Sequence, residues 1–484
     1  MNVKTISRNV GYALLVSALF MFLSVIVSVM NGNDSALTAL VISFLITFIV
    51  GVFPFIFVRR ASQITLKDGY LIIVLSWILS FIFGMLPYAL WGGPFSLANA
   101  WFESVSGFTT TGATILDDVE MLPGSLLFWR TSTHFIGGLG VVVFLLLVIP
   151  DSSPVRLRLT NMELSSMSKD GYSSRTNTIV RIFAYVYLAL CLLAFAAYVL
   201  AGMPVFDAVC HAMSVCATGG FSTRTLSIGA FDSRLIEGIT MVFMLLSSIH
   251  FGIIYMALVK RSLEPLNNPV LKFYVGAIVL FSLFEAVVFR AEGISDSFGN
   301  ALWDGTFHTL CVVSTTGFAT LDNSTWPAVA HTAFLVLGFM CGCSGSTSGG
   351  LKADRLLLLF KAVGCRISRI LNPSSVNEVK LGTRLLRDAE IAPHLLYITL
   401  YVLVLCISSI LAVTFGLSGQ DALSGSLASL GNVGPAMGDI GTYGSFNAVP
   451  NAGKMLFTID MFLGRIEIYP ILAVLAMMFT SGKK

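Results

Sequence analysis

The sequence predicts an all-α membrane protein of ten transmembrane helices and four re-entrant pore helices, built as pseudo-fourfold repeats of helix, pore helix and helix. Three observations support this fold class. Of the 484 residues, 56% are hydrophobic and only 11% are charged, whereas about 25% of the residues in soluble globular proteins are charged. Apolar runs long enough to span a bilayer recur along the chain. Four short loops rich in threonine and glycine lie between these runs at similar intervals, which indicates an internal repeat.

The four loops align without gaps on one reference glycine each, namely Gly112, Gly220, Gly317 and Gly434. Thirteen residues before these glycines stand four short polar residues, Asn99, Asp207, Asp304 and Asp421. A side-chain oxygen of this kind accepts hydrogen bonds from the free amides at a helix start, so each residue is expected to be the N-cap of a pore helix. The expected pore helices cover 100–109, 208–217, 305–314 and 422–431.

The ten spans follow from the apolar runs. A hairpin of two spans, 10–30 and 36–58, opens the chain and is followed by no such loop. The first run is long enough to cross a bilayer, so no cleavable signal peptide is expected. The repeats supply the spans 70–90, 126–149, 182–200, 235–259, 273–289, 328–360, 395–417 and 455–478. The chain is divided accordingly into 1–66 for the hairpin and 67–176, 177–266, 267–390 and 391–484 for the four repeats.

The distribution of lysine and arginine predicts the orientation in the membrane. Basic residues occupy both chain ends and alternate connections: Lys4, Arg8, Arg59, Arg60, Lys67, 151–176, 260–272, 352–387, Lys483 and Lys484. The connections 91–125 and 291–326 contain acidic residues but no lysine or arginine. Because basic residues favour the cytoplasmic side, both termini are expected in the cytoplasm, and the four loops enter from outside.

The basic segments 151–176 and 361–390 are interpreted as topology signals that contact anionic lipid. A docking surface for a soluble regulator is the alternative. The net charge of +3 gives no reason to expect a nucleic-acid partner.

The loops have the composition of a cation filter. A cation that leaves water needs oxygens at close range, and backbone carbonyls supply them without a fixed charge. Glycine permits the backbone angles that turn successive carbonyls toward one axis, and the negative ends of four pore helices would converge there. One such loop alone would indicate only a re-entrant turn, but four aligned copies favour a pore built by a single chain. The candidate ion-binding residues are Thr110, Thr111, Gly112, Ala113, Thr218, Gly219, Gly220, Phe221, Thr315, Thr316, Gly317, Phe318, Asn432, Val433, Gly434 and Pro435.

Two histidines occupy equivalent positions in the pore helices. Nine residues before the reference glycines stand Glu103, His211, His308 and Gly425. We expect both histidines to pack behind the loops and to be dispensable for transport, because a buried histidine is usually a hydrogen-bonded core residue. Lining and titrating in the outer vestibule is the alternative.

The second span of the third repeat is interrupted by a stretch too rich in glycine and serine to hold a continuous helix. This stretch comprises Gly342, Cys343, Ser344, Gly345, Ser346, Thr347, Ser348, Gly349 and Gly350. Irregular backbone at membrane depth must border a cavity or other protein. We interpret the stretch as a mobile intramembrane gate, and a static packing seam of small residues is the alternative.

Arg465 lies near the middle of the last span. A central arginine costs about 2.5–3.5 kcal/mol on insertion scales, so it should face the pore or a partner. The candidate partners are Asp460, Glu467 or free carbonyls of the interrupted stretch. Arg465 is interpreted as a positive barrier in the cation path, and a structural ion pair is the alternative. Arg130, near the outer end of its span, is expected to extend its charge to the interface.

Other classes of function are less consistent with the sequence. The eight cysteines are scattered and suggest neither a zinc site nor a disulfide framework. No phosphate-binding Gly-Lys-Ser/Thr loop is found, so neither an enzyme nor a bound cofactor is expected. The alternative to a pore is a proton- or sodium-coupled secondary transporter, in which broken helices form a midplane site. Such carriers usually show inverted repeats, whereas these four repeats are direct.

The loop sequences Thr-Thr-Gly-Ala, Thr-Gly-Gly-Phe, Thr-Thr-Gly-Phe and Asn-Val-Gly-Pro, with the stretch Gly-Cys-Ser-Gly-Ser-Thr-Ser-Gly-Gly, resemble those of TrkH-type bacterial potassium transporters of the Trk/Ktr/HKT superfamily. The resemblance covers essentially the whole chain. It implies an architecture similar to a potassium channel and potassium uptake at the inner (plasma) membrane, with potassium as substrate. It also implies a homodimer with one pore per subunit and a cytoplasmic nucleotide-binding regulator of the TrkA (RCK) type.

The same resemblance implies roles for particular residues. It makes 342–350 the intramembrane gate and Arg465 the pore arginine. A glycine rather than a serine in the first loop goes with preference for potassium over sodium, and Gly112 satisfies this pattern. The fourth loop departs from the family pattern at Asn432 and Pro435, so its part in ion coordination is the least determined.

Overall fold

The computed structural model describes residues 3–58, 65–148, 176–259, 261, 264–373, 378–382 and 384–481. The described chain is helical apart from connecting loops and a hairpin of two short strands, β1 (Val379–Leu381) and β2 (Arg384–Leu386). The basic residues Arg59, Arg60, Lys260, Lys483 and Lys484 and the segment 151–175 lie outside the described residues.

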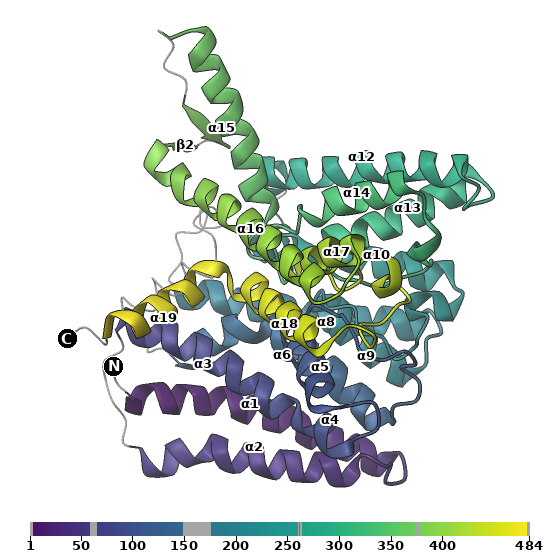
Figure 1. Ribbon diagram of the computed structural model, residues 1–484, viewed down its shortest axis with the longest axis vertical. Helices are drawn as coiled ribbons and strands as arrows, with labels where there is room; N and C mark the ends of the chain where they lie inside the picture. Colours follow the sequence, from purple (N-terminus) through teal and green to yellow (C-terminus); the bar gives the residue numbers. More distant parts are fainter. Residues whose placement is uncertain are drawn as a thin grey trace.

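An N-terminal hairpin of α1 (Val3–Met30) and α2 (Leu37–Phe57) packs along one side of the molecule (Figure 1). The helices approach closely at Gly11, where an added Cβ atom would lie 2.8 Å from the Gly51 carbonyl oxygen. Asp34, in the hairpin loop, accepts hydrogen bonds from the amide and the hydroxyl of Ser125 at 3.1 and 2.9 Å. The hairpin therefore supports the start of α6 in the first repeat.

Each repeat contains a long helix, a short buried helix, a loop and a second helical segment. The first has α3 (Leu66–Gly84), α4 (Leu86–Trp91), α5 (Leu97–Phe108) and α6 (Gly124–Val148), and the second has α8 (Thr176–Leu200), α9 (Val205–Cys216), η2 (Ser227–Phe231), α10 (Arg234–Ser248) and α11 (Phe251–Leu258), followed by η3 (Glu264–Asn267). The third has α12 (Pro269–Ala291), α13 (Phe298–Val313), η4 (Asn323–Thr325), α14 (Ala328–Gly338) and α15 (Ala353–Leu371), and the fourth has α16 (Asp388–Thr414), α17 (Gly419–Gly431), η5 (Gly438–Ile440), α18 (Asn451–Ile466) and α19 (Ile468–Ser481). The short helices α5, α9, α13 and α17 pack against the longer helices around them.

Two spans that the sequence analysis treats as continuous are broken, in addition to the expected break after α14. Helices α10 and α11 meet at an angle of 106°, and the side chain of His250 caps α11 by accepting from the Gly252 amide at 2.9 Å. Helices α18 and α19 are separated at Glu467, whose φ of 68° is incompatible with a right-handed helix. Hydropathy reports neither the extended backbone of Ile249 and His250 between α10 and α11 nor the positive φ of Glu467, so both breaks were missed.

Six helices of the described residues are long and apolar enough to cross a membrane, or seven if the bent pair α10 and α11 counts as one span. The chain is therefore a multi-pass membrane protein. The start of α1 and the end of α19 lie at the same edge of the molecule, at the left of Figure 1.

The prediction of the pore-helix N-caps was wrong. Ser96, Ser297 and Ser418 cap α5, α13 and α17, and α9 begins after Pro204 without a side-chain cap. Helices α5, α9 and α17 thus start two residues before the polar residue that was expected to cap them, and α13 starts six residues before it. A hydroxyl at an earlier position already accepts from the free amides in three of the four helices.

Three of the four residues expected to be caps instead anchor their pore helices to basic side chains, whereas Asp421 accepts from the Ser418 hydroxyl at 2.7 Å. Asp207 accepts from Arg224 at 2.9 Å and Asp304 accepts from Arg234 at 2.8 Å. Asn99 accepts from Lys454 of α18 at 2.8 Å. The hydrogen bond to Asp207 is the main reason that the pKa of Arg224 is raised, so this anchor keeps its charge.

Candidate functional site

The four reference glycines bring the loops into contact around one opening. An added Cβ atom on Gly112 would lie 2.0 Å from the carbonyl oxygen of Gly219, and one on Gly220 would lie 2.1 Å from that of Thr316. An added Cβ atom on Gly317 would lie 2.3 Å from the carbonyl oxygen of Val433, and one on Gly434 would lie 2.4 Å from that of Thr111. Each repeat thus touches the next and the fourth touches the first, so the loops close a ring. No side chain fits at these four positions.

The backbone conformation repeats with the same register in all four loops. The reference glycines have φ values of 83°, 82°, 77° and 93°. Two residues before them, Thr110, Thr218, Thr315 and Asn432 have φ values of 54°, 54°, 61° and 54°. Left-handed angles are uncommon for residues with side chains, so four at one register position reflect a shared loop geometry. The fourth loop departs in sequence but not in this backbone pattern.

Side chains of the pore helices brace the loops from behind. The Ser106 hydroxyl donates to the Ala113 carbonyl at 2.6 Å, and the Cys311 thiol donates to the equivalent Phe318 carbonyl at 2.8 Å. Hydroxyl pairs connect Thr109 with Thr111 at 2.8 Å and Ser314 with Thr316 at 2.7 Å, again at equivalent positions. The hydroxyl of Thr110 is buried and has no partner among the described residues.

All four reference glycines line one cavity of about 60 Å³, together with Ala113, Phe221 and Pro435. A second cavity of about 100 Å³ is lined by Gly137, Ser346, Lys352 and Arg465, among others. The stretch 342–350 contributes residues to the lining of the second cavity and also donates a hydrogen bond to the third loop.

The interrupted stretch is packed against the filter loops and α10. The Gly349 amide donates to the Thr315 hydroxyl at 3.2 Å. The Thr347 hydroxyl is 3.0 Å from the Cys216 carbonyl and 3.1 Å from the Ser247 carbonyl. All residues of 342–350 are buried except Ser346, which is half-buried. The stretch is therefore held in place by the third loop, the end of α9 and α10.

Arg465 donates to the carbonyl oxygens of Thr347 at 2.6 Å and Gly137 at 2.7 Å. A carbonyl of the interrupted stretch was one of its expected partners. The other candidates bond elsewhere, since Glu467 pairs with Arg355 at 2.7 Å and Asp460 accepts from Ser408. Arg465 thus connects the interrupted stretch to α6.

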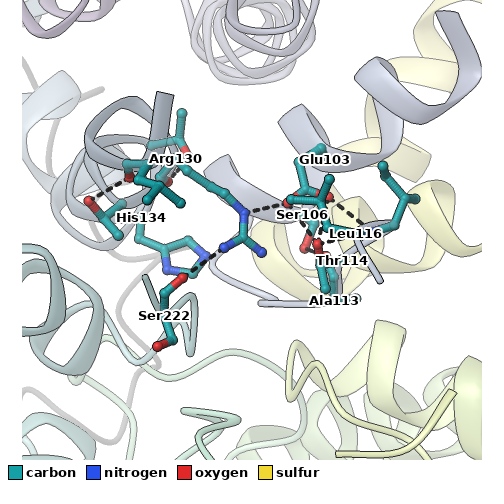
Figure 2. Close-up of polar contacts among 12 residues, drawn as sticks. Glu103, Ser106, Ala113, Thr114, Leu116, Arg130, His134 and Ser222 are labelled. Atoms are coloured by element: carbon teal, nitrogen blue, oxygen red, sulfur yellow. Dashed lines mark hydrogen bonds and ion pairs between the residues drawn. The ribbon is translucent and has the colours of Figure 1, made fainter. Parts of the chain in front are cut away.

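Arg130 does not extend to the interface as expected. Figure 2 shows its guanidinium between the Glu103 carboxylate and the Ser222 carbonyl, with Nε 2.5 Å from Glu103 and an NH group 3.0 Å from Ser222. The side chains of Arg130 and Glu103 are 2% and 0% exposed. Their pairing was not predicted, although two opposite charges within the membrane helices of one repeat are an indication of an ion pair.

The two histidines lie behind the loops. His211 is fully buried, donates to the Asp207 carbonyl at 2.8 Å and accepts from the Ser222 hydroxyl at 2.9 Å. His308 is also fully buried and lies 3.3 Å from the Thr320 hydroxyl. Neither is among the residues that line the cavity at the four reference glycines. Their positions agree with a packing role.

Asn432 has a role that the sequence did not predict. Its amide group donates to the Thr111 hydroxyl at 3.0 Å and to the Met461 carbonyl at 2.9 Å. The side chain therefore joins the fourth loop to the first loop and to α18. A threonine is too short to make both contacts, which explains why this repeat differs from the others.

The chain matches a family model described as a cation transport protein, TrkH, over residues 36–484. It is 30% identical to the Trk system potassium uptake protein TrkH of Salmonella typhimurium, with 98% of each chain covered. It is 33% identical to the TrkI protein of Halomonas elongata, covering 96% of this chain and 94% of that protein. The crystal structure of the potassium transporter TrkH from Vibrio parahaemolyticus superposes with a TM-score of 0.87 at 29% identity, covering 98% and 99% of the two chains. The chain therefore belongs to the TrkH family of cation transport proteins.

Proposed function

We propose that this protein carries potassium into the bacterial cell across the inner membrane, through a filter formed by the four loops. The observation that carries the proposal is the closed ring of loops, with its four reference glycines around one cavity. Carbonyl oxygens around such an opening replace the hydration shell of a potassium ion. The relatives are named potassium uptake proteins. These names favour potassium as the ion and a transporter rather than an enzyme.

The residues proposed to bind potassium are those of the four loops. They are Thr110–Ala113, Thr218–Phe221, Thr315–Phe318 and Asn432–Pro435. The stretch 342–350 is the proposed gate, and Arg465 is a positive barrier that holds it closed through the Thr347 carbonyl. Opening then requires that the stretch leave the path and that Arg465 lose this partner.

The wider assembly is proposed from the topology and the family. The proposed topology has ten spans and four re-entrant helices. A hairpin at 1–66 is followed by four repeats at 67–176, 177–266, 267–390 and 391–484. Both termini lie in the cytoplasm, an arrangement supported by their position at one edge of the molecule (Figure 1). The protein forms a homodimer and is regulated by a cytoplasmic nucleotide-binding subunit similar to TrkA.

The direct test is ion flux from purified protein in liposomes, with and without that regulatory subunit. The expected result is potassium flux that the subunit modulates, with a current that reverses at the potassium equilibrium potential. A reversal potential that shifts with a proton or sodium gradient would instead support the coupled secondary transporter. Complete absence of flux from correctly folded protein, with the subunit present, contradicts both.

A further inference from the structure

The buried pair of Glu103 and Arg130 joins the first filter loop to the second. Glu103 lies on α5 and accepts from the Thr114 hydroxyl at 3.0 Å and from the Ile115 amide at 3.1 Å. Thr114 and Ile115 directly follow the first loop. The carboxylate therefore fixes the segment through which the first loop continues outward.

Arg130 makes the corresponding contacts to the second loop. It donates to the carbonyl oxygen of Ser222, two residues after Gly220, at 3.0 Å. Its guanidinium carbon lies 3.7 Å from the centre of the Phe221 ring, and the His134 ring stacks on the same phenylalanine at 4.1 Å. One guanidinium thus binds the Glu103 carboxylate of the first repeat and the Ser222 carbonyl of the second (Figure 2). It also lies over the Phe221 ring of the second repeat.

The pair is specific to one of the four junctions. The residues equivalent to Glu103 are His211, His308 and Gly425, and none of these makes an ion pair with a described residue of the neighbouring repeat. Arg130 also lines the cavity at the four reference glycines. A charge at this place would repel an entering cation, and Glu103 compensates it.

We infer that Glu103 and Arg130 are positioning residues that set the spacing of the first and second filter loops, and thereby the discrimination of potassium from sodium. This inference rests on the proposed potassium filter. Discrimination depends on how closely the carbonyl oxygens surround the ion. The pair defines that spacing because planar guanidinium geometry fixes the carboxylate and the carbonyl at the same time.

The test compares the unmodified protein with three variants. Glu103→Gln combined with Arg130→Met removes both charges and leaves no unpaired buried ion. Arg130→Lys keeps the charge, but an ammonium group cannot reproduce the fork of donors. Arg355→Met combined with Glu467→Gln is the matched control, because this pair is also buried, at 5% and 16% exposure, yet does not contact the filter loops.

Two measurements are made on each protein. One is the ratio of potassium to sodium flux in liposomes, and the other is the ratio of the two ions' apparent affinities from thermal stabilisation in detergent. We expect the charge-free double variant to lower both ratios at least tenfold and Arg130→Lys to lower them less. We expect the control double variant to keep the affinity ratio of the unmodified protein.

Unchanged ratios in the charge-free variant overturn the inference. If the charge-free variant does not fold, the Arg130→Lys variant provides the test instead. Unchanged flux and affinity ratios in Arg130→Lys would also overturn the inference. An equal loss of discrimination in the control variant also overturns it, because the effect then belongs to any buried ion pair. If the unmodified protein shows no flux but is stabilised selectively by potassium, the proposed transport fails while the affinity ratios still test the inference.

Discussion

The main-chain amide of Gly349 donates a 3.2 Å hydrogen bond to the side-chain hydroxyl of Thr315. This bond joins the interrupted stretch to the filter loop of the third repeat, since Thr315 stands two residues before Gly317. The Thr347 hydroxyl, 3.0 Å from the Cys216 carbonyl, makes a second connection to the end of a pore helix. The proposed gate is thus bonded directly to the proposed filter.

Replacing Thr315 with valine should loosen the gate. The change removes the hydroxyl that accepts from Gly349 and keeps the shape of the side chain. A hydrogen bond of this kind contributes about 0.5–1.5 kcal/mol, so basal potassium flux in liposomes should rise roughly two- to tenfold. The matched control is Thr218→Val, which occupies the same register position, because the Thr218 hydroxyl bonds only to the adjacent Ala217 carbonyl among the described residues. A rise in both variants, or in neither, argues against the connection.

Replacing His308 with asparagine should leave potassium transport close to that of the unmodified protein. His308 is buried behind the third loop, and its Nε2 atom lies 3.3 Å from the Thr320 hydroxyl, a contact that a shorter polar side chain can retain in part. The measurement is liposome flux normalised to folded protein. Loss of flux in a variant that inserts and elutes normally would show that His308 takes a direct part.

The repeat could be predicted from the sequence because its constraint is local. A residue at Gly112 or its equivalents needs a positive φ and space for a neighbouring carbonyl, and only glycine satisfies both. That requirement appears in the sequence as a glycine at each of the four positions. The register of the loops follows from it without knowledge of the packing.

The ends and breaks of helices could not be predicted in the same way. The N-caps were placed on Asp207 and its equivalents because their spacing from the glycines is constant. Asp207 instead pairs with Arg224, which is close in space but 17 residues away in the sequence. The pairing of Arg130 with Glu103 likewise depends on how α5 and α6 pack, and hydropathy does not contain that information.

Replacing Gly220 with alanine should abolish potassium flux. The added Cβ atom would lie 2.1 Å from the Thr316 carbonyl oxygen, so the neighbouring loop must move. Gly202→Ala is the matched control, because Gly202 also has a positive φ, 89°, but an added Cβ atom there would meet nothing within 4 Å. The control substitution therefore costs only the free energy of placing a residue with a side chain at a positive φ, about 1–2 kcal/mol. The control variant should retain flux. If both variants conduct normally, the ring does not form the ion path.

Replacing Arg465 with alanine should raise basal potassium flux at least tenfold. The guanidinium donates to the carbonyls of Thr347 and Gly137, so its loss removes both a positive charge from the path and a connection that holds the gate. Two positive charges about 4 Å apart repel by about 4 kcal/mol at an effective dielectric constant of about 20, which is enough to limit conduction. Arg465→Lys separates the two effects: it keeps the charge but not the double contact, so its flux should lie between those of the unmodified protein and the alanine variant. Flux through folded Arg465→Ala protein at or below the unmodified level would contradict a barrier role and leave Arg465 as a structural connection between α18, the interrupted stretch and α6.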